Sequence, residues 1–293
     1  MSFINGLVYN LIAVILWGCI QVIYFENIKY IPPLEIVSHR AIWAFFFILI
    51  LIALRRKIFN FFEIFKNKKK LLYLITTAML ISSNWFFLIK SISTENVQDA
   101  AMGYYISPIV SVALGYIIFK EKFSKIQFLS LILILIAMIN LIVNIGSIPW
   151  IAISLATTWS LYGVIRKKVN IDSEVGLFFE LSLLLPIFLG YSILLNQNGT
   201  GHFILDDKYT IFFLIGGGLF TALPLFFFNL AIRLIPLSLS GIIFYLVPTL
   251  QFLTAIIYLG EVISFEKIIS FIIIWIAVIL FIFESIKINK KNK

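Results

Sequence analysis

The stretch GYYISPIVSVALGYIIFKEKFS, residues 103–124, is followed 140 positions later by a related stretch, IFYLVPTLQFLTAIIYLGEVIS, residues 243–264. Four residues of special character coincide when the two are superimposed: Tyr105 with Tyr245, Pro108 with Pro248, Glu121 with Glu261, and Ser124 with Ser264. The chain therefore reads as two copies of one unit, residues 1–146 and residues 147–293.

The composition of the chain is that of a membrane protein. Of its 293 residues, 61% are hydrophobic and 13% are charged, whereas about 25% are charged in an ordinary soluble domain. Apolar runs of about 20 residues match the thickness of a bilayer, and in lipid each must be helical because its backbone finds no other partners. The sequence predicts an all-α integral membrane protein with ten transmembrane helices, at residues 5–25, 34–54, 71–91, 98–119, 126–145, 148–165, 174–195, 210–232, 237–259 and 267–286.

Lysine and arginine are distributed unevenly between the two sides of this predicted bundle. Eighteen of the 23 fall on the side that holds both termini, and three fall on the other side. Positive residues favour the cytoplasmic side of a membrane, so both termini are expected in the cytoplasm. The net charge of +9 is then a topology signal, and nucleic acid is excluded as a partner. The single cysteine, Cys19, excludes an intramolecular disulfide.

Each predicted copy contains five helices, and five is an odd number. The second copy must therefore cross the membrane in the opposite direction, and inverted repeats of this kind build alternating gates around a central site in many secondary transporters. Pro108 and Pro248 free the carbonyls of Tyr104 and Phe244, which lipid tolerates only toward protein or a wet cavity. We expect both helices to be kinked, to line the interior and to take part in gating.

The acidic residues at the ends of these two helices have a structural interpretation. Glu121 and Glu261 are expected to anchor the short turns that lead into Ser124 and Ser264, which are good N-cap residues.

Three ionisable residues inside predicted helices are candidates for coupling or gating. His39 and Arg40 lie about one to two turns below a helix start, and they either extend to the interface or act in the interior. In the interior Arg40 would contact an anionic group, while His39 titrates near neutral pH. Glu180 occupies nearly the same place in the second, inverted copy as His39 and Arg40 occupy in the first. A lone buried carboxylate tends to be protonated or paired. His39 and Glu180 are thus the candidate carriers if transport is coupled to protons.

Aromatic and amide residues in the middle of inward-facing helices predict a small-molecule site. Its expected composition is mostly aromatic with a few amides and hydroxyls, which is usual for such sites. For any one aromatic residue, packing or contact with lipid stays open as an alternative. The candidate substrate-binding residues are Trp17, Gln21, Asn84, Trp85, Tyr104, Tyr105, Trp159, Tyr162, Asn229, Tyr245 and Gln251.

Several kinds of chemistry have no signature in the chain. It has no nucleotide-binding loop, no Cys/His cluster and no paired acids at ligand spacing, so we expect no cofactor, no metal, no ATP-driven pump and no enzyme. Two alternatives to a transporter of small organic metabolites stay open. One is a membrane scaffold or assembly protein. The other is an intramembrane enzyme, which would need His39 and Glu180 as its acid–base pair, although they enter from opposite faces.

The motifs of the chain also resemble a known family. These motifs are PLEIVSHRAIW (33–43), SNWFFLI (83–89), GYYISPIVSVALG (103–115), SLYGVIRKK (160–168), FELSLLLP (179–186), TALPLFFF (221–228), PLSLSG (236–241), VPTLQFL (247–253) and GE (260–261). Together they resemble the RarD-type branch of the EamA transporters, within the drug/metabolite transporter superfamily.

The resemblance implies a ten-helix inverted-repeat fold, a location in the bacterial inner membrane, and transport of small metabolites such as amino acids by alternating access. It also implies a cavity formed mainly by the first, third, fourth, sixth, eighth and ninth helices. One departure follows Asn84 and Trp85, where Leu88 and Lys90 replace an aromatic-rich continuation. If this region faces the cavity, the substrate preference of this chain is expected to differ from that of its relatives. Neither the residues nor the resemblance predicts an oligomeric state.

Overall fold

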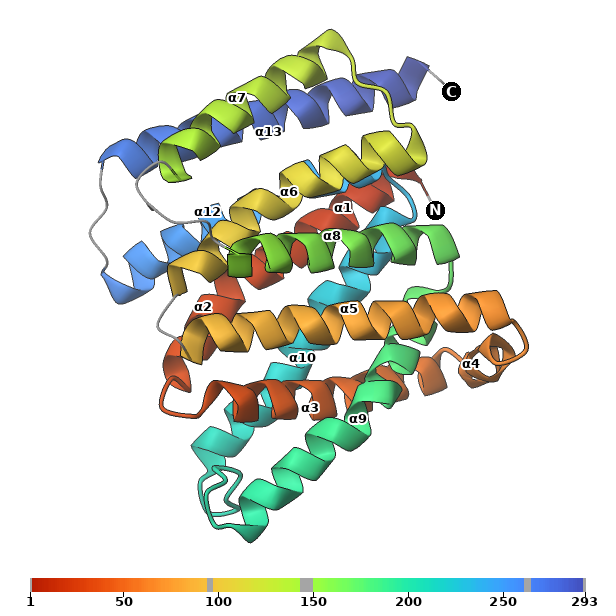
Figure 1. Cartoon of the computed structure of the whole chain (residues 1–293), viewed down its shortest axis with the longest axis vertical. Coiled ribbons are helices and arrows are strands. Elements are labelled where there is room, and N and C mark those ends of the chain that lie inside the picture. Colours follow the sequence, from red (N-terminus) through yellow and green to blue (C-terminus); the bar gives the residue numbers. More distant parts are fainter. Residues whose placement is uncertain (1, 94–96, 143–149, 261–264, 292–293) are drawn as a thin grey trace.

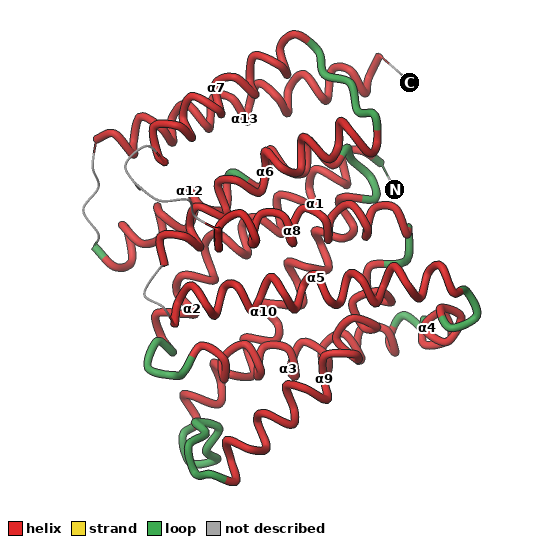
Figure 2. The backbone as a smooth tube through the Cα atoms, in the orientation of Figure 1, coloured by secondary structure: helices red, strands yellow, loops and turns green. Residues whose placement is uncertain are grey.

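A computed structural model of the chain describes residues 2–93, 97–142, 150–260 and 265–291. Within these ranges the regular structure is helical, and the helices lie side by side with short connections between most of them (Figures 1 and 2). Both ends of the chain lie at the same end of the bundle, which we call the terminal end. The opposite end, which holds the connection at residues 28–32, we call the distal end.

The described helices of the first half begin with one long segment interrupted by a π-helical turn. They are α1 (Phe3–Ile15), the π-helical turn η1 (Leu16–Ile20), α2 (Gln21–Asn27), α3 (Pro33–Leu54), α4 (Ile58–Ile64), α5 (Lys68–Ser93), α6 (Val97–Phe119) and α7 (Lys125–Ile142). Those of the second half are α8 (Trp150–Val169), α9 (Ser173–Gln197), α10 (Lys208–Ile232), α11 (Leu237–Phe244), α12 (Leu246–Thr254), the π-helical turn η2 (Ala255–Leu259) and α13 (Phe265–Lys291).

The helices follow the predicted membrane segments closely. In the part of the chain that the structure describes, eight helices are long and apolar enough to cross a membrane. The two remaining predicted segments fall on α7, whose apolar stretch is shorter, and on α8, which ends in three basic residues. The predicted loop at residues 55–70 contains the short helix α4, which is absent from the predicted segments.

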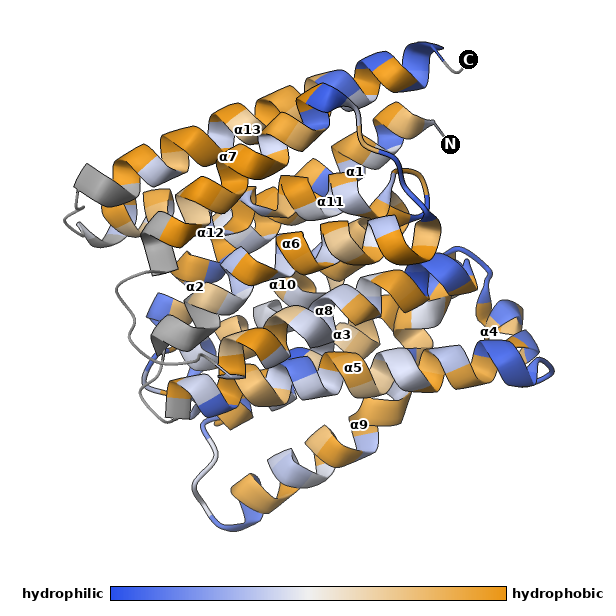
Figure 3. Ribbon diagram, turned by 45° about the horizontal axis from the view of Figure 1, so that its top comes forward, coloured by the Kyte–Doolittle hydropathy of each residue, from blue (hydrophilic) through white to orange (hydrophobic). Residues whose placement is uncertain are grey.

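The outer surface of the bundle is apolar in its middle and polar at its ends (Figure 3). Large apolar side chains such as Ile257, Phe59 and Leu54 are at least 78% exposed. Apolar exposure on this scale is rare in water-soluble monomers, whereas it suits a lipid environment. The protein is therefore an integral membrane protein by fold as well as by composition.

Close approach of backbones fixes the centre of the bundle. α3 packs against α9 and α10, α6 packs against α8 and α11, α1 packs against α10, and α7 pairs with α13. A Cβ atom on Gly218 of α10 would lie 2.5 Å from the backbone nitrogen of Ala44 on α3. Small residues allow such contacts between membrane helices, so Gly218 has a packing role within the glycine run at residues 216–218.

The two repeat prolines behave differently. The helix that contains Pro248 is interrupted at Tyr245, between α11 and α12, as expected when a proline removes a helical hydrogen bond. α6 is helical throughout its length across Pro108.

The predicted N-cap before α7 is confirmed. Ser124 Oγ accepts a hydrogen bond from the backbone N–H of Gln127, whose side chain accepts one from the N–H of Ser124. The two thus form a reciprocal cap of the kind common at helix starts. Glu261 and Ser264 lie outside the described residues.

Candidate functional site

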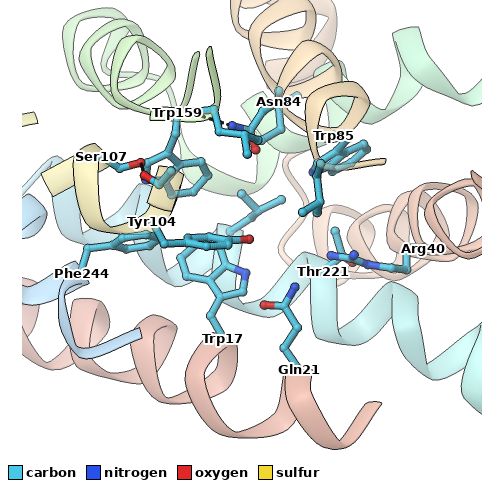
Figure 4. A pocket seen from close by; sticks show the side chains of 15 residues that line it. Trp17, Gln21, Arg40, Asn84, Trp85, Tyr104, Ser107, Trp159, Thr221 and Phe244 are labelled. Carbon is cyan, nitrogen blue, oxygen red and sulfur yellow. Dashed lines mark hydrogen bonds between the residues drawn. The ribbon is translucent and has the colours of Figure 1, made fainter. Parts of the chain in front are cut away.

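A cavity lies in the middle of the bundle, between the two halves of the chain (Figure 4). Protein atoms leave about 640 Å³ unfilled there, including the space that opens to the outside. Its walls come from η1, α2, α3, α5, α6, α8, α10 and α11. They are formed by Trp17, Gln21, Arg40, Ile81, Asn84, Trp85, Leu88, Gly103, Tyr104, Ser107, Leu155, Trp159, Thr221, Leu225 and Phe244.

One wall of the cavity carries its only charged side chain among the described residues, Arg40 of α3. The Nε atom of Arg40 donates a hydrogen bond to Thr221 Oγ1 at 2.8 Å, and its guanidinium carbon lies 5.3 Å from the ring centre of Phe25. The Nη1 atom is buried and has no hydrogen-bond partner. No carboxylate is found among the lining residues.

The position of Arg40 depends on a glycine in the neighbouring helix. A Cβ atom on Gly217 would lie 2.9 Å from Cγ of Arg40 and still closer to the hydroxyl of Tyr24. Gly217 thus leaves room for both side chains against α10. Arg40 is only 8% exposed, so it does not extend to the membrane surface.

Aromatic rings form the opposite wall (Figure 4). Trp17 and Trp159 meet edge to face with ring centres 5.3 Å apart, and Phe244 lies 5.4 Å from Trp159 and 6.4 Å from Tyr104. Contacts of this geometry are favourable beyond their buried area. The cavity therefore has a cationic side and an aromatic side.

The cavity continues toward the distal end into a wider, mostly apolar vestibule. The two spaces share Gln21, Leu88 and Tyr104, and the vestibule leaves about 1180 Å³ unfilled. Gln251 of α12 and Lys29 of the α2–α3 connection line it nearer the surface. A solute from the distal side would meet this vestibule first.

Toward the terminal end, contact between α6 and α11 closes the cavity. A Cβ atom on Gly241 would lie 2.8 Å from Cβ of Ser111 and 3.2 Å from the carbonyl oxygen of Pro108. Ser111 donates a hydrogen bond to Ser160, which donates to the carbonyl of Ser107, both at 3.0 Å. A smaller space of about 260 Å³ remains beside these residues.

Charged side chains hold the α10–α11 turn at the terminal end. The carboxylate of Glu121, from the first half, accepts hydrogen bonds from the backbone N–H groups of Leu237 (2.7 Å) and Ser238 (2.9 Å) at the start of α11. Lys167 donates to two backbone carbonyls at the end of α10 and just beyond it, each at 2.6 Å. Both charges complement the helix dipoles. Glu121 thus has a structural role, but its carboxylate holds the start of α11 and not, as predicted, the turn that leads into Ser124.

Ion pairs also join the two halves at this end. Lys57 lies 2.7 Å from Asp172 and 2.9 Å from Glu174, and Arg55 lies 3.2 Å from Glu174. Partial burial alone would raise the pKa of Asp172, but hydrogen bonds and charge from Lys57 and Arg233 lower it below its usual 3.8.

A second polar cluster is buried between α8, α9 and α10. Tyr162 donates to Glu180 at 3.1 Å and accepts from Asn229 at 2.8 Å, while Nε of Arg166 donates to Asn229 at 2.9 Å. The same nitrogen lies 3.7 Å from Glu180, and both charged side chains are 2% exposed. Tyr162 and Asn229 each have two hydrogen-bond partners within this cluster, which joins α8, α9 and α10.

The comparisons with known proteins decide the family. Residues 4–143 match the model of the EamA-like transporter family. Protein RarD of Salmonella typhi is 33% identical over 98% of this chain and 98% of its own length. Protein RarD of Escherichia coli is 32% identical over 98% and 97%. The chain belongs to the RarD-type EamA transporter family.

Other relatives carry transporter names. The uncharacterized transporter YojE of Bacillus subtilis is 33% identical over 99% of this chain and 97% of its own length. A solved crystal structure has the same fold, with a TM-score of 0.77 over 96% of this chain and 98% of that one, at 13% identity. The protein is thus a membrane transporter by family.

Seven of the predicted site residues of this RarD-type chain line the cavity. They are Trp17, Gln21, Asn84, Trp85, Tyr104, Trp159 and Arg40. The contributing helices include all six that the resemblance implies, together with α3 through Arg40. Gln251 lines the vestibule instead, and Pro108 lines the small space beneath the cavity.

Besides Gln251, four predicted substrate-binding residues lie outside the cavity, and they do not line the vestibule either. Tyr105 packs against Phe271, with ring centres 6.5 Å apart, and Tyr245 is fully buried with its hydroxyl 3.1 Å from the sulfur of Met138. Tyr162 and Asn229 belong to the Arg166–Glu180 cluster. Adjacent residues on a helix point about 100° apart, so Tyr104 and Phe244 face the cavity where Tyr105 and Tyr245 cannot.

The other three candidates for coupling or gating, His39, Glu180 and Pro248, do not line the cavity. His39 stacks on Phe203 with ring centres 5.1 Å apart, and Glu180 sits in the cluster with Arg166. The two do not meet in one cavity, so the arrangement offers no acid–base pair for an intramembrane enzyme. Pro248 is buried just after the interruption between α11 and α12.

Sequence reasoning missed Thr221, Ser107 and Phe244 among the cavity residues. A signal existed for Thr221 and Ser107, because hydroxyls in the middle of membrane helices usually face protein. Phe244 and the aliphatic lining residues carry no such signal in a chain with 30 phenylalanines.

Proposed function

We propose that the protein is a secondary transporter that moves small organic solutes, such as amino acids or related metabolites, by alternating access. The observation that carries the proposal is the central cavity. Side chains from both halves line it, the vestibule connects it to the distal end, and contact between α6 and α11 closes it toward the terminal end. A transporter must close one side of its site while the other is open.

The inverted-repeat architecture of ten helices is part of this proposal. It is supported by the 140-residue offset and by the packing of corresponding helices. α3 packs against α9, α6 against α11, and α7 against α13, and such contacts between corresponding helices are compatible with a twofold axis between residues 1–146 and 147–293. An even number of crossings also agrees with termini at one end of the bundle.

In the proposed cycle, the described conformation is the one with the distal side open. The opposite conformation would separate α6 from α11 and bring their distal parts together. Pro108 lies directly at the α6–α11 contact, and Pro248 follows the break between α11 and α12, so both are placed where bending is needed. Basic residues gather at the terminal end, which supports a cytoplasmic location for it.

The test is flux through the purified protein reconstituted in liposomes. A panel of radiolabelled amino acids, organic acids, nucleosides and quaternary amines would be presented, and saturable uptake of at least one is expected. Trp159→Ala should reduce this uptake because the ring lines the cavity. Tyr105→Ala is the matched control, since Tyr105 lies outside the cavity. Folded, inserted protein that moves no member of the panel would favour a membrane scaffold.

Proton coupling through His39 or Glu180 is a separate proposal. If Glu180 carries the proton, Glu180→Gln should abolish the pH dependence of uptake while uptake itself continues. An unchanged pH profile in that variant would remove Glu180 from the role, and the same comparison for His39→Gln would decide the second candidate.

A further inference from the structure

The guanidinium of Arg40 is an unusual group to find in the wall of a membrane cavity. It is buried, its Nη1 atom has no partner, and no acid lines the same space among the described residues. An isolated buried charge costs several kcal/mol unless it is paired, and a charged residue inside a membrane protein usually marks a substrate or ion pathway. The missing partner is therefore a feature to be explained.

We propose that Arg40 is the receptor for a carboxylate group of the substrate, and that the solutes moved are carboxylates with an apolar or aromatic body. The inference rests on the proposed transport function and names its substrate class. A carboxylate matches the planar donor geometry of arginine and can accept two hydrogen bonds from it. On binding, it supplies both the hydrogen-bond acceptor and the counter-charge that the cavity lacks.

The surroundings of Arg40 hold its guanidinium in the cavity wall. Thr221 accepts from Nε at 2.8 Å and itself donates to the carbonyl of Gly217 at 2.8 Å, which fixes its acceptor lone pairs toward the arginine. Phe25 covers the guanidinium at 5.3 Å. The side chain is thus held in place before the substrate arrives, which lowers the entropic cost of binding.

The rest of the cavity selects the body of the solute. Trp17, Trp159, Tyr104 and Phe244 gather on the side opposite Arg40 (Figure 4). A molecule with its carboxylate at Arg40 would place its other end among these rings. Inorganic anions would pair with Arg40 but leave the aromatic wall unused, so they should bind more weakly.

The test compares acids with amides of the same shape. The pairs are 3-phenylpropanoate and 3-phenylpropanamide, L-phenylalanine and L-phenylalaninamide, and L-leucine and L-leucinamide, with nitrate as the inorganic arm. Binding to purified protein in detergent is measured by calorimetry. At least one acid should bind, and its amide should bind about ten to a hundred times more weakly, as expected for loss of a charged hydrogen bond.

Three variants separate recognition from folding. Arg40→Met should lose the preference for acids yet unfold at the same or a higher temperature than the wild type, because it removes an unpaired buried charge. Arg40→Lys should keep part of the preference. Lys208→Met, which removes an exposed charge at the start of α10, is the matched control and should bind as the wild type does.

The outcomes distinguish this inference from the transport function. Equal binding of acid and amide, nitrate binding as tightly as the acids, or an acid preference that survives in Arg40→Met would each overturn the role of Arg40. Absence of binding by every acid would overturn it as well, and flux of a neutral solute would then leave the transport function standing. Carboxylate binding without flux would keep the site and remove the transport function.

Discussion

Arg166→Met is the substitution for which the structure makes the sharpest energetic prediction. Arg166 is 2% exposed, donates to Asn229 and to the carbonyl of Ser173, and pairs with Glu180 at 3.7 Å. Methionine retains much of the apolar volume but leaves the carboxylate of Glu180 buried without its cation. Removing one member of a buried pair costs about 3–5 kcal/mol, a large fraction of the 5–15 kcal/mol typical of a folded domain.

A second substitution identifies the origin of that cost. If the loss comes from the uncompensated charge of Glu180, the double variant Arg166→Met, Glu180→Gln should recover at least half of it. Gly176→Ala tests the position of Arg166 by steric means, because a Cβ atom at residue 176 would overlap the Nη1 atom of Arg166. That variant should be destabilised although its charges are intact.

The assay is denaturant unfolding in mixed micelles, followed by the fluorescence of the six tryptophans. Arg233→Met is the matched control, since Arg233 is 26% exposed at the terminal end and exposed pairs contribute about 0–1 kcal/mol. The reasoning is refuted if Arg166→Met unfolds within about 1 kcal/mol of the control, or if the double variant is no more stable than Arg166→Met alone.

Three further predictions concern the glycine run and the terminal end. Gly218→Ala should destabilise by about 1–3 kcal/mol because its Cβ would meet the α3 backbone. Gly216→Ala, whose Cβ would have no neighbour beyond the adjacent residues and its own helix backbone nearer than 3.7 Å, should be neutral or stabilising. Equal unfolding midpoints for the Gly216→Ala and Gly218→Ala variants would contradict this contrast. Asp172→Asn should cost about 0.5–1 kcal/mol at neutral pH. Folding lowers the pKa of Asp172, so its ionised carboxylate stabilises the folded state fully above pH 3.8, and this stabilisation disappears as the pH falls through the lower folded pKa. A difference in melting temperature between Asp172→Asn and the wild type that persists at acid pH would refute the prediction. Glu121→Gln should weaken the cap of α11 and so loosen its contact with α6 at Ser111. In a protein without the native cysteine, a cysteine placed at Ser111 should then react several times faster with a polar thiol reagent than it does when Glu121 is present. An unchanged rate would count against closure by Glu121.

The helices could be predicted from sequence because lipid leaves little choice. Long apolar runs must be helical, and every predicted segment overlaps helical structure in the described residues. α4 was missed because its seven residues (Ile58–Ile64) are too few to give a membrane-length signal and lie among basic residues.

The site could be predicted only in part. Arg40, Trp17 and Asn84 were found because polar or large aromatic residues in the middle of membrane helices are informative. The failures of Tyr105 and Tyr245 came from rotation about the helix axis, which composition alone does not determine. The cluster of Arg166 and Glu180 was missed because Arg166 reads as a cytoplasmic charge within its basic run, and only packing reveals that its side chain turns inward.

The unpaired charge of Arg40 also has an electrical consequence. With no solute bound, the cavity holds a positive charge inside the low-dielectric region, while a bound carboxylate would make the same site neutral. A membrane potential acts on a charge that moves across the field by about 2.3 kcal/mol per elementary charge per 100 mV. Under alternating access, voltage would therefore act on the return of the empty protein and leave the loaded step almost untouched. Such a protein would favour exchange of one solute for another over net movement whenever the potential opposes that return.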